Sequence, residues 1–187
     1  MDRFVIISGC SGGGKSSLLE ELRRRGYPTV EEPGRRIVAA ERVSGGNALP
    51  WTDMAGFARR AMALALQDRS DIAGAEGLVF FDRSLIENMF TVLAHVTGED
   101  VLTPLQTMHR YHRMVFLAPP WPEIYAGDAE RRHGFDAAVE EYARLEAAYP
   151  SLGYDITILP KASVSARAAF LLRMLDQGGE PPLTDAG

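Results

Sequence analysis

The segment GCSGGGKS at residues 9–16 constrains this chain more than any other part of its sequence. It matches the G-x-x-x-x-G-K-[ST] phosphate-binding pattern at every fixed position. A short apolar run, FVIIS at residues 4–8, precedes it and is typical of a strand buried on both faces. After it, SSLLEEL at residues 16–22 has the apolar spacing of a helix. Strand, glycine loop and helix together predict a site for a nucleoside triphosphate with Mg2+.

Each residue type in this loop has a physical role in holding phosphate. Gly12, Gly13 and Gly14 carry no Cβ and allow positive φ, so backbone N–H groups can turn inward toward phosphate oxygens. Lys15 is expected to reach the β- and γ-phosphates, and the Ser16 hydroxyl to ligate Mg2+. A glycine-rich turn without a ligand is the alternative. The residues expected to bind the nucleotide are Gly9, Cys10, Ser11, Gly12, Gly13, Gly14, Lys15, Ser16 and Ser17.

Composition narrows the class of protein. The net charge of −5 and an isoelectric point near 5.4 give no sign of a basic face, so no nucleic-acid partner is expected. A single cysteine excludes a disulfide framework and favours a reducing, cytoplasmic setting. The early strand leaves no room for a signal peptide, and no apolar run is long enough to cross a membrane. We expect a cytoplasmic monomer or homodimer.

Strand and helix patterns alternate along the rest of the chain. Further strands are expected at residues 27–30, 78–82, 114–118 and 154–159, and helices at 33–43, 53–73, 84–95, 103–113, 135–149 and 163–175. This alternation predicts an α/β fold in which helices cover both faces of a parallel sheet. With 187 residues, the chain suits one domain over residues 1–177, followed by a flexible tail at 178–187.

Asp82 and Arg83 are candidate catalytic residues at a strand end. Asp82 closes the apolar run LVFFD, and ligands of such sheets bind beyond the carboxyl ends of the strands. Asp82 is therefore the candidate second group on Mg2+, the alternative being an N-cap for the helix expected at 84–95. Arg83 can pair with a carboxylate or stabilise transferred charge, the alternative being a surface arginine.

A second acidic position follows the second expected strand. In Glu31-Glu32-Pro33, the proline disfavours helix at Glu32 and keeps it extended at the sheet edge. There Glu32 can accept a proton from a substrate hydroxyl. Glu31 and Glu32 point in opposite directions, so only one is expected to enter the cleft. An acid that merely favours a helix N-terminus is the alternative.

Arg131 and Arg132 lie in a charged stretch, DAERRHG, at residues 128–134. Arginines there can close over the γ-phosphate and stabilise its oxygens, as lid arginines do. A solvated run of charges is the alternative.

Two groups of residues give weaker signals. Trp51, Phe57 and Gln67 could line an acceptor pocket, although aromatic residues at helical spacing are more often part of a core. His109 and His112 are expected on an ordinary helix surface, since their spacing alone is weak evidence for a metal site.

The assembled motifs resemble those of P-loop NTPases of the nucleoside and nucleotide kinase group. More narrowly, they resemble the AAA_28-type predicted ATPases, which include the kinase domain of NadR. The resemblance covers most of residues 3–175 and is carried by GCSGGGKSS, VEEPGRR, VFFDRS, DAERRHGF and GYDITILPKASVSARAAFLL.

This resemblance implies a three-layer P-loop fold with five parallel strands in the order 2-3-1-4-5. It also implies a lid near residues 119–134 and an adenine pocket near 160–163. One departure is that the lid lacks the well-spaced arginine series of nucleotide kinases. The implied roles are Glu32 as base, Asp82 with Mg2+, Arg83 beside the acceptor, and Arg131 or Arg132 in the lid.

These observations predict an enzyme, a P-loop phosphotransferase of the small-molecule kinase or ATPase type. It would move the γ-phosphoryl of ATP, with GTP as the alternative donor, to a small acceptor such as a nucleoside-like molecule. Two alternatives remain. One is a nucleotide-dependent switch that signals through its lid, and the other is a plain ATPase or GTPase with slow hydrolysis.

Overall fold

The computed structural model describes residues 3–87, 110–125 and 134–177. Arg131, Arg132, His109, the tail at 178–187 and most of the helices expected at 84–95 and 103–113 lie outside the described residues. In chain order, the elements are β1 (Phe4–Gly9), α1 (Lys15–Arg24), β2 (Thr29–Val30), α2 (Pro33–Ser44), α3 (Met54–Asp71), β3 (Val79–Asp82), β4 (Met114–Ala118), the 3-10 helix η1 (Pro122–Ile124), α6 (Phe135–Ser151), β5 (Asp155–Ile158) and α7 (Val164–Asp176).

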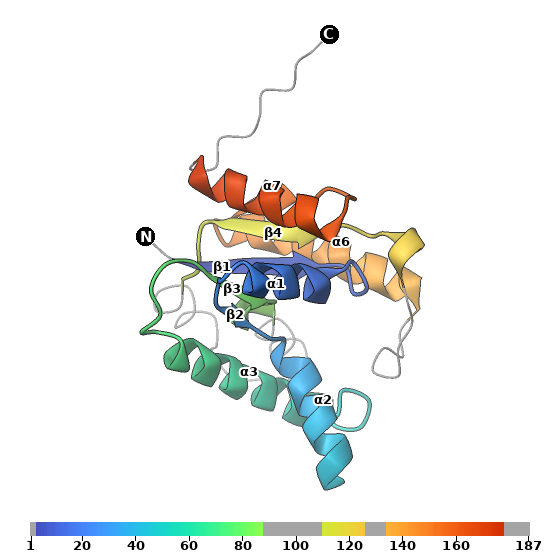
Figure 1. Cartoon of the computed structure of the whole chain (residues 1–187). Coiled ribbons are helices and arrows are strands. Elements are labelled where there is room, and N and C mark those ends of the chain that lie inside the picture. Colours follow the sequence, from blue (N-terminus) through green and yellow to red (C-terminus); the bar gives the residue numbers. More distant parts are fainter. Residues whose placement is uncertain (1–2, 88–109, 126–133, 178–187) are drawn as a thin grey trace.

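The five strands form one parallel sheet in the order β2-β3-β1-β4-β5, which confirms the expected fold class and strand order. β1 lies at the centre (Figure 1), with Ile7 level with Asp82 of β3 and Gly9 level with Ala118 of β4. Because parallel strands end at the same edge of a sheet, the loop after β1 and the ends of β3 and β4 come together there.

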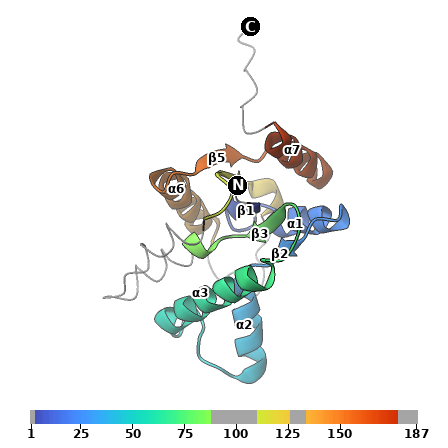
Figure 2. The same cartoon turned by 90° about the vertical axis from the view of Figure 1, so that its left-hand side faces the viewer.

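Successive residues of β1 enter different apolar clusters, as expected for a strand covered on both faces. Phe4 and Ile6 pack with residues of α6, whereas Val5 and Ile7 pack with residues of α1 and α7. Figure 2 shows the same layers, with α6 on one side of the sheet and α1 and α7 on the other. Burial of each large side chain contributes about 1.5–3 kcal/mol, so these layers hold the sheet edge in place.

Local signals in the sequence start and stop the helices. α2 begins with Pro33 in its first turn and ends at Gly45, which adopts φ 70°. The side chain of Asp53 accepts a hydrogen bond from the Gly56 N–H at the start of α3, and Ser163 accepts one from Ala166 N–H at the start of α7. α2 and α3 lie together beside β2 at one edge of the sheet (Figures 1 and 2).

The prediction of a helix at 103–113 was wrong for its C-terminal part. Residues 110–113 are not helical, because the chain has already joined the sheet there. His112 N–H donates to Phe4 O at 2.7 Å, two residues before β4 begins. In the part of the chain that is described, no helix has both the length and the apolar character to span a lipid bilayer.

Candidate functional site

The glycine loop joins β1 to α1 and is fixed at both ends. Gly9 has φ 105°, and a Cβ there would collide with the backbone of Ala118. Cys10 N–H donates to Ala118 O at 2.9 Å, and Gly13 N–H donates to Cys10 O at 3.1 Å. Gly14, with φ 75°, is the N-cap of α1. The turn therefore brings the N-terminal end of α1, where unpaired N–H groups attract anions, to the sheet edge.

Lys15 is buried against this turn. Its ammonium donates to Cys10 O at 3.0 Å and to Gly9 O at 3.4 Å. Burial lowers its pKa and the charge of Arg83 lowers it further, while the carboxylates of Asp82 and Glu32 oppose the shift. The ammonium thus donates to two neutral carbonyl groups. A bound phosphate can take their place and supply a charged acceptor, which forms a stronger hydrogen bond.

Arg167 of α7 contacts the loop as well, a contact that the sequence analysis missed. Its guanidinium donates to Gly13 O at 3.0 Å and to Gly14 O at 3.3 Å. The side chain is fully buried, and its charge lies 5.8 Å from the centre of the Trp121 ring. The only available signal was the position of this arginine on the otherwise apolar face of α7, beside Ala168 and Leu171.

Arg83 lies at the end of β3 and gathers three carboxylates. Its guanidinium is 2.7 Å from Glu87, 2.8 Å from Glu141 and 3.2 Å from Glu32. Its backbone has φ 66°, an uncommon value for a residue with a side chain, and its N–H donates to Ile7 O of β1. The backbone bond and the three ion pairs together hold Arg83 in this conformation.

Glu32 is one of these three partners. Besides Arg83, it accepts a hydrogen bond from Arg35 at 3.2 Å. Burial acts to raise the pKa of Glu32, but the charges of Arg83, Lys15 and Arg35 outweigh it and lower the pKa below its ordinary value. The carboxylate is therefore ionised at neutral pH and interacts electrostatically with the lysine of the glycine loop.

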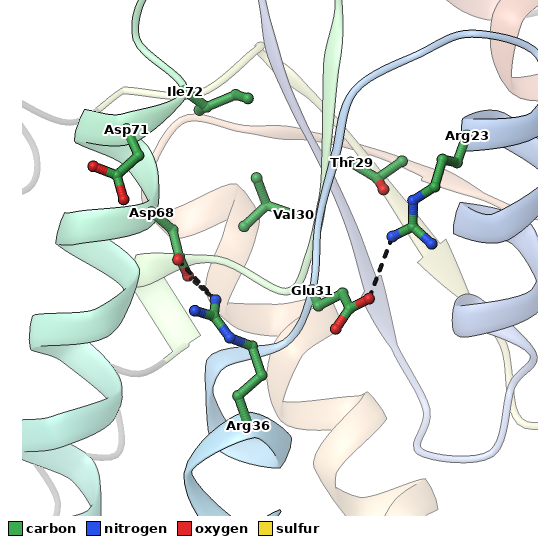
Figure 3. Close-up of a pocket in the computed structure, with 8 residues that line it drawn as sticks. All are labelled: Arg23, Thr29, Val30, Glu31, Arg36, Asp68, Asp71 and Ile72. Atoms are coloured by element: carbon green, nitrogen blue, oxygen red, sulfur yellow. Dashed lines mark hydrogen bonds and ion pairs between the residues drawn. The ribbon is translucent and has the colours of Figure 1, made fainter. Parts of the chain in front are cut away.

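The neighbouring residue Glu31 has different partners. It pairs with Arg23 of α1 at 3.4 Å and lines a pocket of about 310 Å³ beside β2. Figure 3 shows this pocket, where Arg36 also pairs with Asp68. No residue of the glycine loop lines the pocket. Its lining residues are Arg23, Thr29, Val30, Glu31, Arg36, Asp68, Asp71 and Ile72.

Asp82 is buried at the end of β3, next to the glycine loop in the sheet. Burial raises its pKa to about 6, the charge of Glu32 adds to the rise, and the cations Lys15 and Arg83 oppose it. One of its carboxylate oxygens, Oδ1, is buried without a hydrogen-bond partner. A buried acceptor without a donor is costly, so this oxygen is suited to a cation or a donor supplied by a ligand.

A second group of polar residues contacts Arg83 through Glu87. The sequence did not predict this group. The Tyr149 hydroxyl of α6 donates to Glu87 at 2.6 Å and lies 3.1 Å from the Ser84 hydroxyl. Both Tyr149 and Glu87 are buried. Burial, followed by the charge of Glu87, raises the pKa of Tyr149 well above its ordinary value, so its hydroxyl remains a donor. Glu87 is thereby fixed between Arg83 and Tyr149.

The three residues considered for an acceptor pocket, Trp51, Phe57 and Gln67, do not lie together. The Phe57 ring lies against Gly34, where an added Cβ would be 3.1 Å from the ring and 3.6 Å from a Glu32 oxygen. Trp51 is partly exposed and lies 6.0 Å from the Arg42 guanidinium, and Gln67 donates to Asp71 on the surface of α3. Of these three, Phe57 is the one that adjoins Glu32.

Comparison with known families and sequences agrees with this arrangement. The model of the family AAA_28, described as an AAA domain, matches residues 4–167. A nucleotide-binding protein from Granulibacter bethesdensis is 33% identical over 85 residues, which are 44% of this chain and 26% of that protein. The aligned stretch thus represents about a quarter of the relative's length.

Solved structures share the fold at low identity. NadR, in complex with NR, superposes with a TM-score of 0.62 at 19% identity, covering 100% of this chain and 54% of that one. A deoxyadenosine kinase from M. mycoides gives 0.60 at 14% identity, covering 93% and 98% of the two chains. A shikimate kinase from Acinetobacter baumannii gives 0.58 at 13%, covering 97% of each. These likenesses establish a P-loop kinase-like fold.

Proposed function

The chain belongs to the AAA_28 family of AAA domains, and on that premise we propose that it is a phosphotransferase. In this proposal it binds ATP, or alternatively GTP, and moves the γ-phosphoryl to a hydroxyl or phosphate of a small molecule. Similar folds bind small acceptors, since one neighbour is a shikimate kinase with shikimate and another is NadR with NR.

The observation that carries the proposal is the position of Glu32. Its carboxylate is held by Arg83 and interacts with the charge of Lys15, the residue proposed to bind the phosphates. The direct interaction between this paired carboxylate and a triphosphate would be repulsive, so binding of the nucleotide does not explain its position. The carboxylate is well suited to accept a hydrogen bond from an acceptor hydroxyl and to orient that oxygen for attack.

The other residues take roles that follow from their surroundings. The glycine loop and the N-terminal end of α1 bind the phosphates, and Lys15 leaves its two carbonyl acceptors to do so. Arg83 keeps Glu32 ionised and in place. Phe57, next to Glu32, forms a wall of the acceptor site. Arg131 and Arg132, outside the described residues, are proposed as lid arginines that stabilise the transferred phosphoryl group.

The residues present fit Mg2+. Magnesium prefers oxygen ligands, and usually keeps one or two protein groups alongside phosphate oxygens and water. The buried, unpartnered Oδ1 of Asp82 and the exposed hydroxyl of Ser16, at the start of α1, supply such groups. When bound, Mg2+ would neutralise charge on the β- and γ-phosphates. Asp82 would then be ionised, despite its raised pKa.

The experiment is to incubate the protein with ATP or GTP, Mg2+ and a library of nucleosides and other small hydroxyl compounds, and to detect phosphorylated products. Glu32→Gln is expected to lower transfer by about 100-fold or more while keeping the affinity for ATP, because glutamine keeps the size of the side chain but removes the carboxylate proposed to bind the acceptor hydroxyl. Glu31→Gln is the matched control and is expected to keep both the transfer and the affinity for ATP, since Glu31 pairs with Arg23 and lines the pocket beside β2.

Two results would count against the proposal. Slow hydrolysis of the triphosphate that no compound accelerates, at the same rate in Glu32→Gln as in the wild type, would favour a switch or a plain ATPase. Retained tight binding of triphosphate in Lys15→Ala would overturn the assignment of the glycine loop itself, since that variant is expected to lose it.

A further inference from the structure

Arg167 places a positive charge against the carbonyl groups of the glycine loop. It belongs to the first turn of α7, far from the loop in the sequence, and donates to Gly13 O at 3.0 Å and Gly14 O at 3.3 Å. The fit is close, because a Cβ on Gly14 would lie 2.7 Å from the guanidinium. The contact is thus built into the packing of α7 against α1.

This charge has no carboxylate partner among residues 3–87, 110–125 and 134–177. Its neighbours are the two carbonyl groups and the face of Trp121, and its Nε is buried without a hydrogen-bond partner. Burial lowers the pKa of Arg167, and no acidic side chain in the described part of the chain opposes that effect. An isolated buried cation is costly to a folded protein, in contrast to the paired Arg83.

The bonds from Arg167 act on the peptide groups that face the phosphates. The carbonyl of Gly13 belongs to the same peptide unit as Gly14 N–H, and the carbonyl of Gly14 to the same unit as Lys15 N–H. A cation that bonds to a carbonyl draws electron density toward it and makes the N–H of that unit a stronger donor. The N–H groups of Gly14 and Lys15 lie at the N-terminal end of α1, where the phosphates are proposed to bind.

We propose that Arg167 is a positioning residue for polyphosphate. It strengthens the N–H donors of the glycine loop through the carbonyl groups of the same peptide units. A polyphosphate bound in the loop compensates its buried charge, which has no carboxylate partner among the described residues. The inference rests on the part of the proposed function that concerns triphosphate binding, and it holds whichever acceptor is used and whether or not a phosphoryl group is transferred.

The test is the affinity of Arg167→Met for tripolyphosphate, ATP, ADP, AMP and adenosine, measured by calorimetry. Methionine is of similar length and removes the charge. The loss of affinity is expected to reach about tenfold or more for ATP and tripolyphosphate and to shrink toward none for adenosine. Arg173→Met is the matched control, because Arg173 is an exposed arginine of the same helix, and it is expected to change none of these affinities.

A purely structural role gives a different pattern. Equal losses for adenosine and ATP, or a normal affinity of Arg167→Met for tripolyphosphate, would overturn the proposal. The melting temperature of the variant without ligand is expected to stay within about 4 °C of the wild type, because an uncompensated charge is removed together with its hydrogen bonds.

Arg167→Lys provides a second variant if the methionine variant does not fold. It keeps the charge but loses the paired geometry of the guanidinium, so it is expected to retain part of the affinity for tripolyphosphate. A lysine variant that binds adenosine and ATP with equally reduced affinity would contradict the proposal. If the wild type binds no triphosphate at all, the proposed function fails first, and that result is distinct from a failure confined to Arg167.

Discussion

At the scale of single residues, Arg83 joins parts of the chain that are distant in sequence. Its guanidinium connects Glu32, before α2, with Glu87 and with Glu141 of α6. The residue does so from a backbone conformation with φ 66°, which costs roughly 1–2 kcal/mol for a residue that is not glycine. The surrounding ion pairs and the bond to Ile7 O offset that cost.

Replacing Arg83 is therefore expected to be severe. Arg83→Met removes the cation that the buried Glu87 and the partly buried Glu32 and Glu141 share, and we expect the free energy of unfolding to fall by about 3–5 kcal/mol. Urea denaturation measures this. Arg24→Met is the control, with an expected loss below about 1 kcal/mol, because Arg24 is exposed and Glu21 keeps Arg25. Similar losses in both variants would contradict the role of the cluster.

The raised pKa of Asp82 makes stability depend on pH. Its pKa is about 6 in the folded protein against 3.8 for an ordinary aspartate, so the folded state binds a proton that the unfolded chain has already released. This contribution to stability is complete below pH about 4 and is lost as the pH rises through about 6, a change of roughly 3 kcal/mol.

Asp82→Asn should remove this dependence. Without metal or nucleotide, the variant is expected to be more stable than the wild type at pH 7 and to lose that advantage toward pH 4. Urea unfolding of both proteins in EDTA across this range measures the difference, in which other titrating groups cancel. A difference that is constant with pH would show that Asp82 has an ordinary pKa.

At the scale of elements, the turn between α2 and α3 is organised by one buried acid. Glu41 of α2 accepts hydrogen bonds from Ala48 N–H, at 2.8 Å, and from Arg60 of α3. Gly46 passes directly over this carboxylate, where a side chain would collide. Glu41 thus ties the turn to both helices, and α2 begins next to Glu32.

We expect Glu41→Ala to loosen this turn selectively. The Ala48 amide should exchange its hydrogen much faster, and the free energy of unfolding should fall by about 1–3 kcal/mol, because a partly buried donor is left without its acceptor. Hydrogen exchange resolved by residue measures both effects. Amides of β1 are expected to keep their protection relative to global unfolding. Glu20→Ala, at an exposed position of α1, should leave the exchange rate of the Ala48 amide unchanged.

At the scale of the whole molecule, the site depends on a sheet that is covered on both faces. β4 lies between β1 and β5 and is buried along its whole length, and the loop after β1 bonds to its last residue, Ala118. Weakening β4 should therefore destabilise the fold and the loop together.

Phe116→Ala tests this dependence. The side chain is fully buried in the cluster with α1 and α7, and its loss is expected to cost about 3–5 kcal/mol. Ile158→Ala, on the edge strand β5 and half exposed, is expected to cost about 1 kcal/mol or less. Thermal unfolding of the two variants measures the contrast, and equal losses would contradict the role of β4 as a buried strand of the core.

Much of the fold could be predicted because its signals are local. The strand at 114–118, the helix that begins at Pro33 and the last helix, expected from residue 163, each depend on a few neighbouring residues, and the structure has them within a residue of where they were expected. The expected helix end at 110–113 failed because Tyr111 is held by distant groups. Its hydroxyl accepts from Leu85 N–H, and its N–H donates to Tyr154.

The sequence by itself determined the glycine loop and the alternation of strands and helices, and it predicted the candidates Glu32, Asp82 and Arg83, whereas the strand order was an expectation from the family resemblance. The loop, the alternation and the candidates lie in short segments whose residue types and spacing carry the physics. Only the tertiary structure decided which of Glu31 and Glu32 pairs with Arg83, that Arg83 gathers three acids, and that Arg167 donates to the carbonyl groups of the loop. Those contacts join residues up to 154 positions apart, and no local pattern specifies which distant side chains will meet.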